Sequence, residues 1–398
     1  MPQGDAAALR GDASPRIVVV AGEASGDLHG ARLAQALTRL CPQVRLSGMG
    51  GDAMRAAGVT LVADAGQTAV VGLTELWEKR RVLQAALTRL RTHLAEIRPV
   101  LLVCIDFPDF NLLLARTAHR LRIPVCYFIS PQVWAWRRGR IRTIRRLVRK
   151  MLVLFPFEER LYRAAGVDVS FVGHPLLDLL APVPSREACR AGFEIPPDRR
   201  VVGLLPGSRQ AELRRHLPLL LAAAARIREA RPETQFLLGL SPGADRRAVQ
   251  GMVESAGVPV RVIQGSTHAV IRAADLLLAV SGTVTLEAAI LGTPLIITYR
   301  LGLLSWLVAR LLVQVRFIGL PNLVAEEAVV PELIQFDAKP ERLATVALGI
   351  LDSPARQAAM RAALADVTRR LGSPGAAERA ARAILALCGV PLRGEPAS

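Results

Sequence analysis

Short apolar runs alternate with longer segments of helical periodicity along most of the chain. Such alternation is typical of parallel sheets whose two faces are covered by helices. We therefore predict an α/β fold with two doubly wound, Rossmann-like domains that face a cleft. The expected strands are Arg16–Ala21, Val100–Ile105, Val125–Ile129, Met151–Phe155 and Val169–Val172 in the first half, and Val201–Leu205, Gln235–Leu240, Val260–Ile263, Asp275–Val280 and Pro294–Thr298 in the second.

Prolines indicate where the two halves divide. Residues 174–200 contain Pro175, Pro182, Pro184, Pro196 and Pro197, a density that interrupts regular structure. The last part of the chain is rich in Ala, Leu and Arg at helical spacing, so we expect helices there that pack back on the body. The predicted divisions are a disordered leader at 1–15, a first Rossmann-like domain at 16–180, a linker at 181–200, a second Rossmann-like domain at 201–340 and C-terminal helices at 341–398.

Composition narrows the class of partner. The 51 Lys and Arg exceed the 34 Asp and Glu, and the resulting net charge of +17 favours nucleic acid, phospholipid or a phosphorylated substrate. Aromatic residues make up 4% of the chain and are not interleaved with Arg, which disfavours nucleic acid. The five cysteines are scattered without metal-ligand spacing, so we expect neither disulfides nor a metal site, and no cofactor.

The distribution of apolar segments indicates in which cellular compartment the protein acts. The first fifteen residues contain no apolar core of a secretory signal, so we expect a cytoplasmic protein. The longest apolar stretch, residues 301–320, is interrupted by Arg310, Gln314 and Arg316, whose cost at the bilayer centre disfavours a spanning helix. We expect instead an amphipathic helix that is buried or lies on a surface.

The run Ser281-Gly282-Thr283 follows an expected strand and opens a helix. Unpaired backbone N–H groups at a helix start, together with the helix dipole, form a seat for phosphate. Glu287 lies one turn further along on the face of Thr283, where its carboxylate could reach a sugar diol. The pattern indicates a nucleotide-sugar pocket, and an ordinary capped helix is the alternative.

Two further motifs of the second half carry polar groups. Ser208 and Arg209 follow the strand at 201–205, and a forked guanidinium beside a Gly-Ser turn suits a departing diphosphate. A surface salt bridge from Arg209 to Glu212 is the alternative. Asn322, after Pro321, is expected either to bind the nucleotide or to form a turn.

Acidic residues follow two strands of the first half. Glu23, Ser25 and Asp27 lie after the first strand, where carboxylates would repel a pyrophosphate but suit sugar hydroxyls; helix capping is the alternative for Ser25 and Asp27. Asp106 and Asp109 follow the very apolar strand at 100–105. Crowding with Glu23 predicts a raised pKa for one of the two, as a general base requires, whereas a turn and a helix cap are the alternative.

A basic segment follows the strand at 125–129. Trp134 and Trp136 lead into eight cations without an acid among them, which fits an interfacial anchor or a wall for an anionic ligand. A solvated helix face is the alternative. The cations are Arg137, Arg138, Arg140, Arg142, Arg145, Arg146, Arg149 and Lys150.

Taken in order, the blocks AGEASGD, DFPDFN, YFISPQVWAW, FPFEERLY, FVGHP, LLPGSR, SGTVTLE and IGLPNLVAE closely resemble the lipid-A-disaccharide synthases. These are glycosyltransferases of GT-B architecture in the Gram-negative lipopolysaccharide pathway, and the resemblance covers residues 17–333. It implies inverting transfer of 2,3-diacylglucosamine from UDP-2,3-diacylglucosamine to the 6-hydroxyl of 2,3-diacylglucosamine 1-phosphate (lipid X), releasing UDP. It also implies that the domain at 16–180 binds the acceptor and the domain at 201–340 binds the UDP-sugar. The enzyme would belong to lipid A biosynthesis and be peripherally associated with the anionic inner membrane.

The resemblance carries over to individual residues. It does not settle which aspartate is the base; the position of Asp109 nearer the helix start favours Asp109. Val70, Val71, Leu73 and Leu76 would admit acyl chains, an ordinary amphipathic helix start being the alternative. The positions that match UDP-side motifs are Arg209, Ser281, Gly282, Thr283, Glu287 and Asn322, and those that match the acidic blocks are Glu23, Asp27, Asp106 and Asp109.

Two other functions stay open. Another GT-B enzyme, such as a UDP-N-acetylglucosamine 2-epimerase or a soluble-acceptor transferase, would not explain the basic segment with its tryptophans. A non-catalytic basic binding protein would release no UDP from the acylated substrates. Acyl chain length, the depth of membrane contact and the formation of a homo-oligomer are not readable from the sequence.

Overall fold

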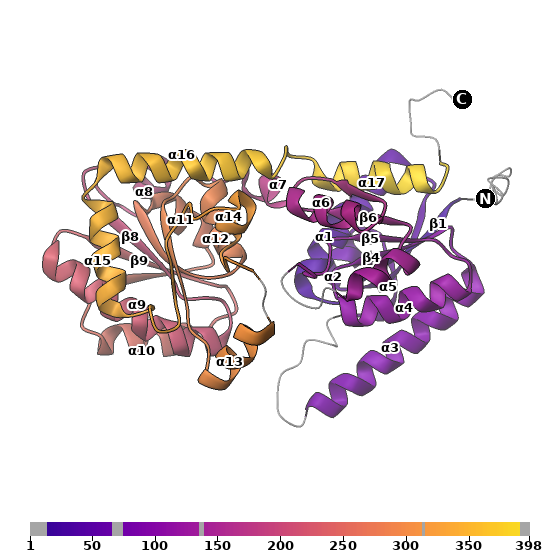
Figure 1. The fold of residues 1–398 in the computed structure, drawn as a ribbon, viewed down its shortest axis with the longest axis horizontal. Helices are drawn as coiled ribbons and strands as arrows, with labels where there is room; N and C mark the ends of the chain where they lie inside the picture. Colours follow the sequence, from indigo (N-terminus) through magenta and orange to yellow (C-terminus); the bar gives the residue numbers. More distant parts are fainter. Residues whose placement is uncertain (1–13, 66–74, 135–138, 313–314, 391–398) are drawn as a thin grey trace. The chain divides into compact units, whose positions relative to one another are not determined.

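The computed structural model describes residues 14–65, 75–134, 139–312 and 315–390. The chain forms two compact units, each a parallel sheet with helices between its strands (Figure 1). The first unit consists of Met1–Pro175 together with Ser373–Ser398, and the second of Leu176–Gly372.

The sheet of the first unit has the strand order β3-β2-β1-β4-β5-β6-β7, with every neighbouring pair parallel. The order reverses between β1 and β4, where Val19 lies opposite Val103. The strands are β1 Arg16–Ala21, β2 Arg45–Gly50, β3 Thr60–Asp64, β4 Leu101–Ile105, β5 Val125–Phe128, β6 Lys150–Val153 and β7 Val169–Phe171.

Helices cover both faces of this sheet because its central strands are apolar on both sides. Ile17 and Val19 of β1 face α1 (Ala24–Leu40), α2 (Asp52–Ala56) and α17 (Ala376–Leu387). Val18 and Val20 belong to the core on the other face. That face is covered by α3 (Glu75–Ile97), α4 (Pro108–Arg120), α5 (Arg140–Leu147) and α6 (Pro156–Ala164).

The sheet of the second unit has the parallel strand order β10-β9-β8-β11-β12-β13, and the order reverses between β8 and β11. Its strands are β8 Val201–Leu205, β9 Gln235–Leu240, β10 Val260–Gln264, β11 Leu276–Val280, β12 Leu295–Tyr299 and β13 Glu332–Ile334. Its helices are α7 Leu176–Leu180, α8 Arg186–Gly192, α9 Gln210–Ala230, α10 Arg246–Ser255, α11 Thr267–Ala273, α12 Thr283–Ile290, α13 Leu303–Leu312, α14 Leu320–Ala325, α15 Pro340–Leu351 and α16 Pro354–Arg370.

The chain changes units at Pro175, and the segment 181–200 that we predicted as a linker is part of the second unit. Arg190 explains why this proline-rich segment folds. Its buried guanidinium donates to the Asp275 carboxylate at 2.9 Å and to the Ala273 carbonyl at 3.0 Å, which ties α8 to the sheet. The predicted C-terminal helices at 341–398 are also divided, since α15 and α16 belong to the second unit and α17 to the first.

The amphipathic helix expected within residues 301–320 is α13, which exposes Leu303 and Leu307. No helix in the described part of the chain is long and apolar enough to cross a membrane.

Candidate active site

Open parallel sheets bind ligands beyond the carboxyl ends of their strands, at the point where the strand order reverses. In the second unit this point lies between β8 and β11, and a cavity of about 570 Å³ is found there. It is lined by residues that follow four strands and by the first turns of α12. Its polar lining includes Ser208, Arg209, Glu212, Ser241, Thr267, His268, Ser281, Gly282, Thr283 and Glu287.

The start of α12 forms one wall of the cavity. Gly282 is the N-cap residue and supplies no side-chain cap, so the partial positive charge of the helix start opens on the cavity. The hydroxyl of Ser281 donates to the Ile318 carbonyl at 3.0 Å and holds the loop. The predicted phosphate seat therefore lies in the same cavity as Arg209 and Glu287.

The loop after β8 forms the facing wall, and Glu212 holds its shape. The Glu212 carboxylate accepts the N–H groups of Ser208 at 3.0 Å and Arg209 at 3.3 Å. Gly207 has φ +104, and a Cβ there would lie 2.5 Å from Glu212 Oε2, so only glycine fits. The Arg209 guanidinium pairs with Glu212 at 3.2 Å but is 83% exposed, and such a pair costs little to open for a ligand.

His268 is a site residue that the motif-based reasoning missed. Its Nε2 lies 3.3 Å from Glu287 Oε2, and this hydrogen bond raises the pKa of His268. The contact places a titratable cation beside the carboxylate that we expected at a sugar diol. The sequence could have indicated His268 by its position after a predicted strand. It follows the Gly265-Ser266-Thr267 segment after β10, at the same sheet edge as the other loops.

In the first unit the strand order reverses between β1 and β4, and Glu23 and Asp106 follow these two strands. Burial, with the nearby Glu23 carboxylate, raises the pKa of Asp106 to about 6. The two loops approach closely, since a Cβ at Gly22 would lie 2.1 Å from Cδ1 of Phe107. This arrangement supplies a carboxylate that accepts protons near neutral pH.

Asp109 has a different environment from Asp106. Its side chain is 75% exposed in the first turn of α4, and its carboxylate forms an ion pair with Arg140 of α5. The backbone of Asp106 is left-handed, with φ 44, and its carbonyl accepts the Asn111 side-chain amide at 2.8 Å. The two candidate bases therefore differ in environment, because Asp106 is largely buried beside Glu23 whereas Asp109, which we preferred, is exposed and ion-paired.

Asp27, which we expected at sugar hydroxyls, instead holds α2. Its buried carboxylate accepts the backbone N–H groups of Gly51 at 2.7 Å, Ala53 at 3.0 Å and Met54 at 3.1 Å. These bonds satisfy the unpaired donors at the start of α2. The capping alternative therefore holds for Asp27, although the helix that it caps is not its own. Ser25 is exposed in the first turn of α1.

Asn322, which we expected at the nucleotide, is fully buried in α14. Its Oδ1 accepts the N–H groups of Val329 and Val330 at 2.9 Å. Its Nδ2 donates to the Val330 carbonyl at 2.9 Å and to Glu332 at 2.8 Å. All its hydrogen-bonding capacity is spent on Val329, Val330 and Glu332. Asn322 therefore lies in a helix, where it holds the chain that leads into β13, and not in the turn that we expected as the alternative.

Trp134 is half-buried at the carboxyl edge of the first sheet. Its indole Nε1 donates to Glu158 Oε1 at 3.2 Å, and its ring meets the Phe157 ring edge-on at 5.3 Å. Burial raises the pKa of Glu158 to about 8. Trp134 is thus held in the unit through Glu158 and Phe157, and its role as an interfacial anchor stays a prediction. The other residues predicted for membrane or acyl contact lie outside the described residues or have side chains that do: Val70, Val71, Leu73, Leu76, Trp136, Arg137 and Arg138.

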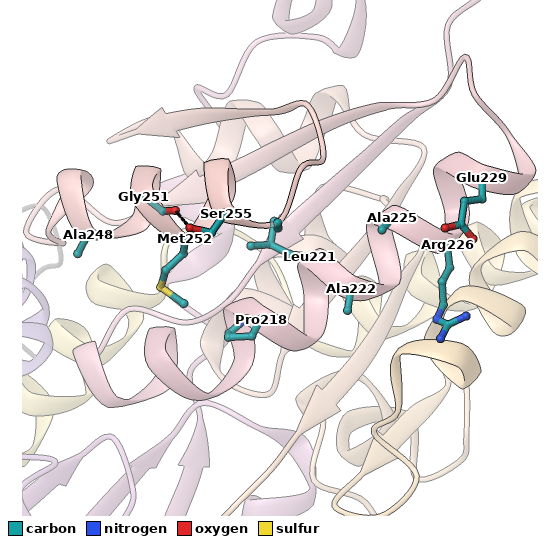
Figure 2. A pocket seen from close by; sticks show the side chains of 11 residues that line it. Pro218, Leu221, Ala222, Ala225, Arg226, Glu229, Ala248, Gly251, Met252 and Ser255 are labelled. Carbon is teal, nitrogen blue, oxygen red and sulfur yellow. Dashed lines mark hydrogen bonds between the residues drawn. The ribbon is translucent and has the colours of Figure 1, made fainter.

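A second hollow, of about 910 Å³, lies between α9 and α10 in the second unit (Figure 2). Pro218, Leu221 and Met252 line it, and the hydroxyl of Ser255 is turned back to the Gly251 carbonyl at 2.7 Å. It lacks the strand-end loops that bind ligands in such folds. The described residues also contain no group of three or more His, Cys, Asp or Glu that could hold a metal ion.

Comparison with known proteins adds the family. The family model of lipid-A-disaccharide synthetase matches residues 17–386. Lipid-A-disaccharide synthase of Syntrophus aciditrophicus is 49% identical over 94% of this chain and 98% of its own length. That of Geobacter sulfurreducens is 46% identical with the same coverage.

Solved structures with the same fold are much more distant in sequence. An S. aureus MnaA structure with UDP matches with a TM-score of 0.65 at 12% identity, covering 96% of this chain and 99% of that one. The glycotransferase of kitacinnamycin matches with a TM-score of 0.61 at 17% identity, covering 94% and 99%. The predicted α/β fold with two Rossmann-like domains is confirmed.

Proposed function

Because the chain belongs to the lipid-A-disaccharide synthase family, we propose that this glycosyltransferase transfers 2,3-diacylglucosamine from UDP-2,3-diacylglucosamine to the 6-hydroxyl of lipid X, with inversion. The products are the lipid A disaccharide 1-phosphate and UDP. The observation that carries the proposal is the cavity at the β8–β11 reversal, where Arg209, the start of α12 and Glu287 line one space.

The second unit binds the donor in this proposal. Arg209 and the N–H groups that begin α12 hold the diphosphate and stabilise the charge that grows on it as the glycosidic bond breaks. Glu287 accepts hydrogen bonds from sugar hydroxyls and is oriented by His268. The UDP named in the S. aureus MnaA structure supports a UDP-binding role for a fold of this kind.

The first unit supplies the base. Asp106 takes the proton of the acceptor hydroxyl while that oxygen attacks the anomeric carbon on the side opposite UDP, which inverts its configuration. Burial keeps the pKa of Asp106 at about 6, high enough for proton transfer and low enough for the carboxylate to predominate at neutral pH. Charge repulsion from Glu23 contributes to this value as the second cause of the shift, after burial.

The site of action in this proposal is the anionic surface of the inner membrane. Both sugars carry acyl chains that partition into lipid, and the chain carries a net charge of +17. The enzyme would meet its substrates there as a peripheral protein.

The test is release of UDP from UDP-2,3-diacylglucosamine with lipid X as acceptor. We expect turnover with lipid X and little with a deacylated acceptor, and Arg209→Gln should lower kcat by about 100-fold. Arg369→Gln is the matched control, because Arg369 also forms an exposed ion pair with an acid three residues away, Asp366. Equal turnover with both acceptors would refute the lipid acceptor. Conversion of UDP-N-acetylglucosamine without an acceptor would favour an epimerase.

A further inference from the structure

A cavity of about 500 Å³ in the first unit has a lining dominated by cations. It lies where α3, α4 and α5 run beside one another on one face of the sheet (Figure 1). No acid is among its lining residues. The lining, called here the arginine pocket, consists of Arg91 of α3, Leu113, Arg116, His119 and Arg120 of α4, and Arg146 and Leu147 of α5.

Among the described residues, the arginines of this pocket lack the acidic partners that two cations nearby have. Arg140 and Lys150 each form an ion pair with an aspartate. Within the described part of the chain, no Asp or Glu lies within 4.0 Å of the four pocket arginines. Like charges gathered around one cavity repel one another, and a bound anion would remove that repulsion.

Individual N–H donors in the arginine pocket also favour a bound anion. The Nε of Arg91 is buried and has no hydrogen-bond partner among the described residues, a state that costs free energy unless a ligand or water satisfies it. Arg120 makes one long bond, at 3.3 Å, to the Thr117 hydroxyl, so most of its fork stays available. Guanidinium forks match the oxygens of phosphate in pairs.

The arginine pocket is separate from both parts of the candidate active site. The donor cavity belongs to the second unit. Within the first unit, α4 begins at Pro108, beside Asp106 at the carboxyl edge of the sheet, and runs back toward the amino ends of the strands. Arg116, His119 and Arg120 lie on its last turns, at the opposite edge from Asp106.

We propose that the arginine pocket is a second binding site, which takes a phosphate group. The ligand is the phosphate of a phospholipid headgroup or of a soluble phosphorylated molecule, since both present the same oxygens to the guanidinium forks. Leu113 is 40% exposed at the rim and Leu147 lies in the wall, so the site also offers apolar contact to the carbon atoms next to that phosphate. The site does not depend on the glycosyl transfer proposed above.

The test compares two double variants of the full chain that remove the same charge. The double variant Arg116→Gln with Arg120→Gln removes two guanidinium groups from the pocket. The double variant Arg246→Gln with Arg247→Gln removes two exposed arginines of α10. Probes are glycerol 3-phosphate, measured by calorimetry, and vesicles of phosphatidylcholine with and without phosphatidylglycerol, measured by co-sedimentation. The pocket variant should bind at least about tenfold more weakly, and the α10 variant should differ little from wild type.

The two probes separate the sources of phosphate. Pocket-dependent binding of glycerol 3-phosphate supports a soluble ligand, and pocket-dependent binding of phosphatidylglycerol vesicles alone supports a lipid headgroup. Equal weakening in both variants, or unchanged binding in the pocket variant, overturns the proposal, as does wild-type protein that binds neither probe. Arg146→Gln tests the same pocket from another helix. Hydrogen exchange in β1 and β4 of each variant reports that the first unit is folded.

Discussion

At the scale of single residues, two aspartates three positions apart have opposite environments. Asp106 is largely buried beside Glu23, whereas Asp109 is exposed and paired with Arg140. The sequence predicted a crowded carboxylate but could not say which, because the difference depends on a left-handed turn at Asp106 and Phe107 and on the position of α5. The sequence did not predict His268 as a site residue for a similar reason, since its contact with Glu287 joins two helices.

Replacing the two aspartates should separate their roles. Asp106→Asn removes the base while keeping its shape, and we expect kcat for UDP release to fall by about 100- to 10,000-fold. Wild-type kcat should also fall as the pH drops below about 6, because Asp106 then becomes protonated and cannot accept the proton. Asp109→Asn is the matched control and should keep most of the activity. A full loss in Asp109→Asn with an active Asp106→Asn would reverse the assignment.

His268 should make donor binding depend on pH. Its pKa is raised in the folded protein, so it carries a positive charge at low pH and loses it as the pH rises. The Kd of a UDP-sugar, measured by calorimetry, should therefore increase several-fold from acid to alkaline pH. His268→Arg keeps the charge, so the Kd should stay low and no longer change with pH. His268→Gln removes the charge, so the Kd should also not change with pH but should equal the high value of wild type at alkaline pH. A pH dependence that persists unchanged in both variants would exclude His268 as its source.

At the scale of elements, apolar runs predicted ten strands, and all ten are present within one or two residues at each end. The three other strands in the described part of the chain are β2, β3 and β13. β3 contains the short apolar run Leu61-Val62-Ala63, which our prediction left out, whereas β2 and β13 have no such run. In β2, Gly48 lies so close to β1 that a Cβ would be 1.9 Å from the Val19 carbonyl oxygen, so packing requires glycine where propensity disfavours a strand. β13 has only three residues. The sequence did not show which segments Asp27 and Asn322 hold, because the partners of both side chains lie in other elements.

The contact between Asp27 and α2 can be measured as stability. Asp27→Ala leaves three buried or half-buried N–H groups without an acceptor, and the free energy of unfolding should fall by about 1–3 kcal/mol. Asp52→Ala is the control on the same helix, because Asp52 is 96% exposed and pairs only with Arg55 at the surface. Its cost should stay below about 1 kcal/mol. Urea unfolding of both variants gives the comparison, and equal costs would contradict the capping role.

At the scale of the whole molecule, the first unit is discontinuous in sequence. The helix α17, about two hundred residues beyond Pro175, lies against α1 and the sheet with Ala380, Ala381 and Ile384 fully buried. Arg39 of α1 also pairs with Glu378 of α17 at 2.8 Å. The alanine-rich composition of this helix predicted that it would pack, but not against which unit, since small apolar residues fit many surfaces.

Loss of packing under α17 should weaken the first unit alone. Ile384→Ala opens a cavity in its core and should lower the free energy of unfolding by about 2–4 kcal/mol. Ala386→Ser, on the exposed side of the same helix, should cost about 0.5 kcal/mol or less. Hydrogen exchange should show lower protection in β1 and β4 and unchanged protection in β8 and β11. Equal loss in both sheets would mean that the two units unfold as one.

The position of α17 in the sequence also determines when the first unit can complete its fold during translation. The 197 residues of Leu176–Gly372 must be made after the strands of the first unit and before the helix that covers them. At about 5–20 residues per second this takes roughly 10 to 40 s. Throughout that interval the apolar face formed by Ala36, Leu37 and their neighbours lacks its final cover on the ribosome. The nascent chain is then a client for any chaperone that binds exposed aliphatic surface, and slower translation of the second unit prolongs that exposure.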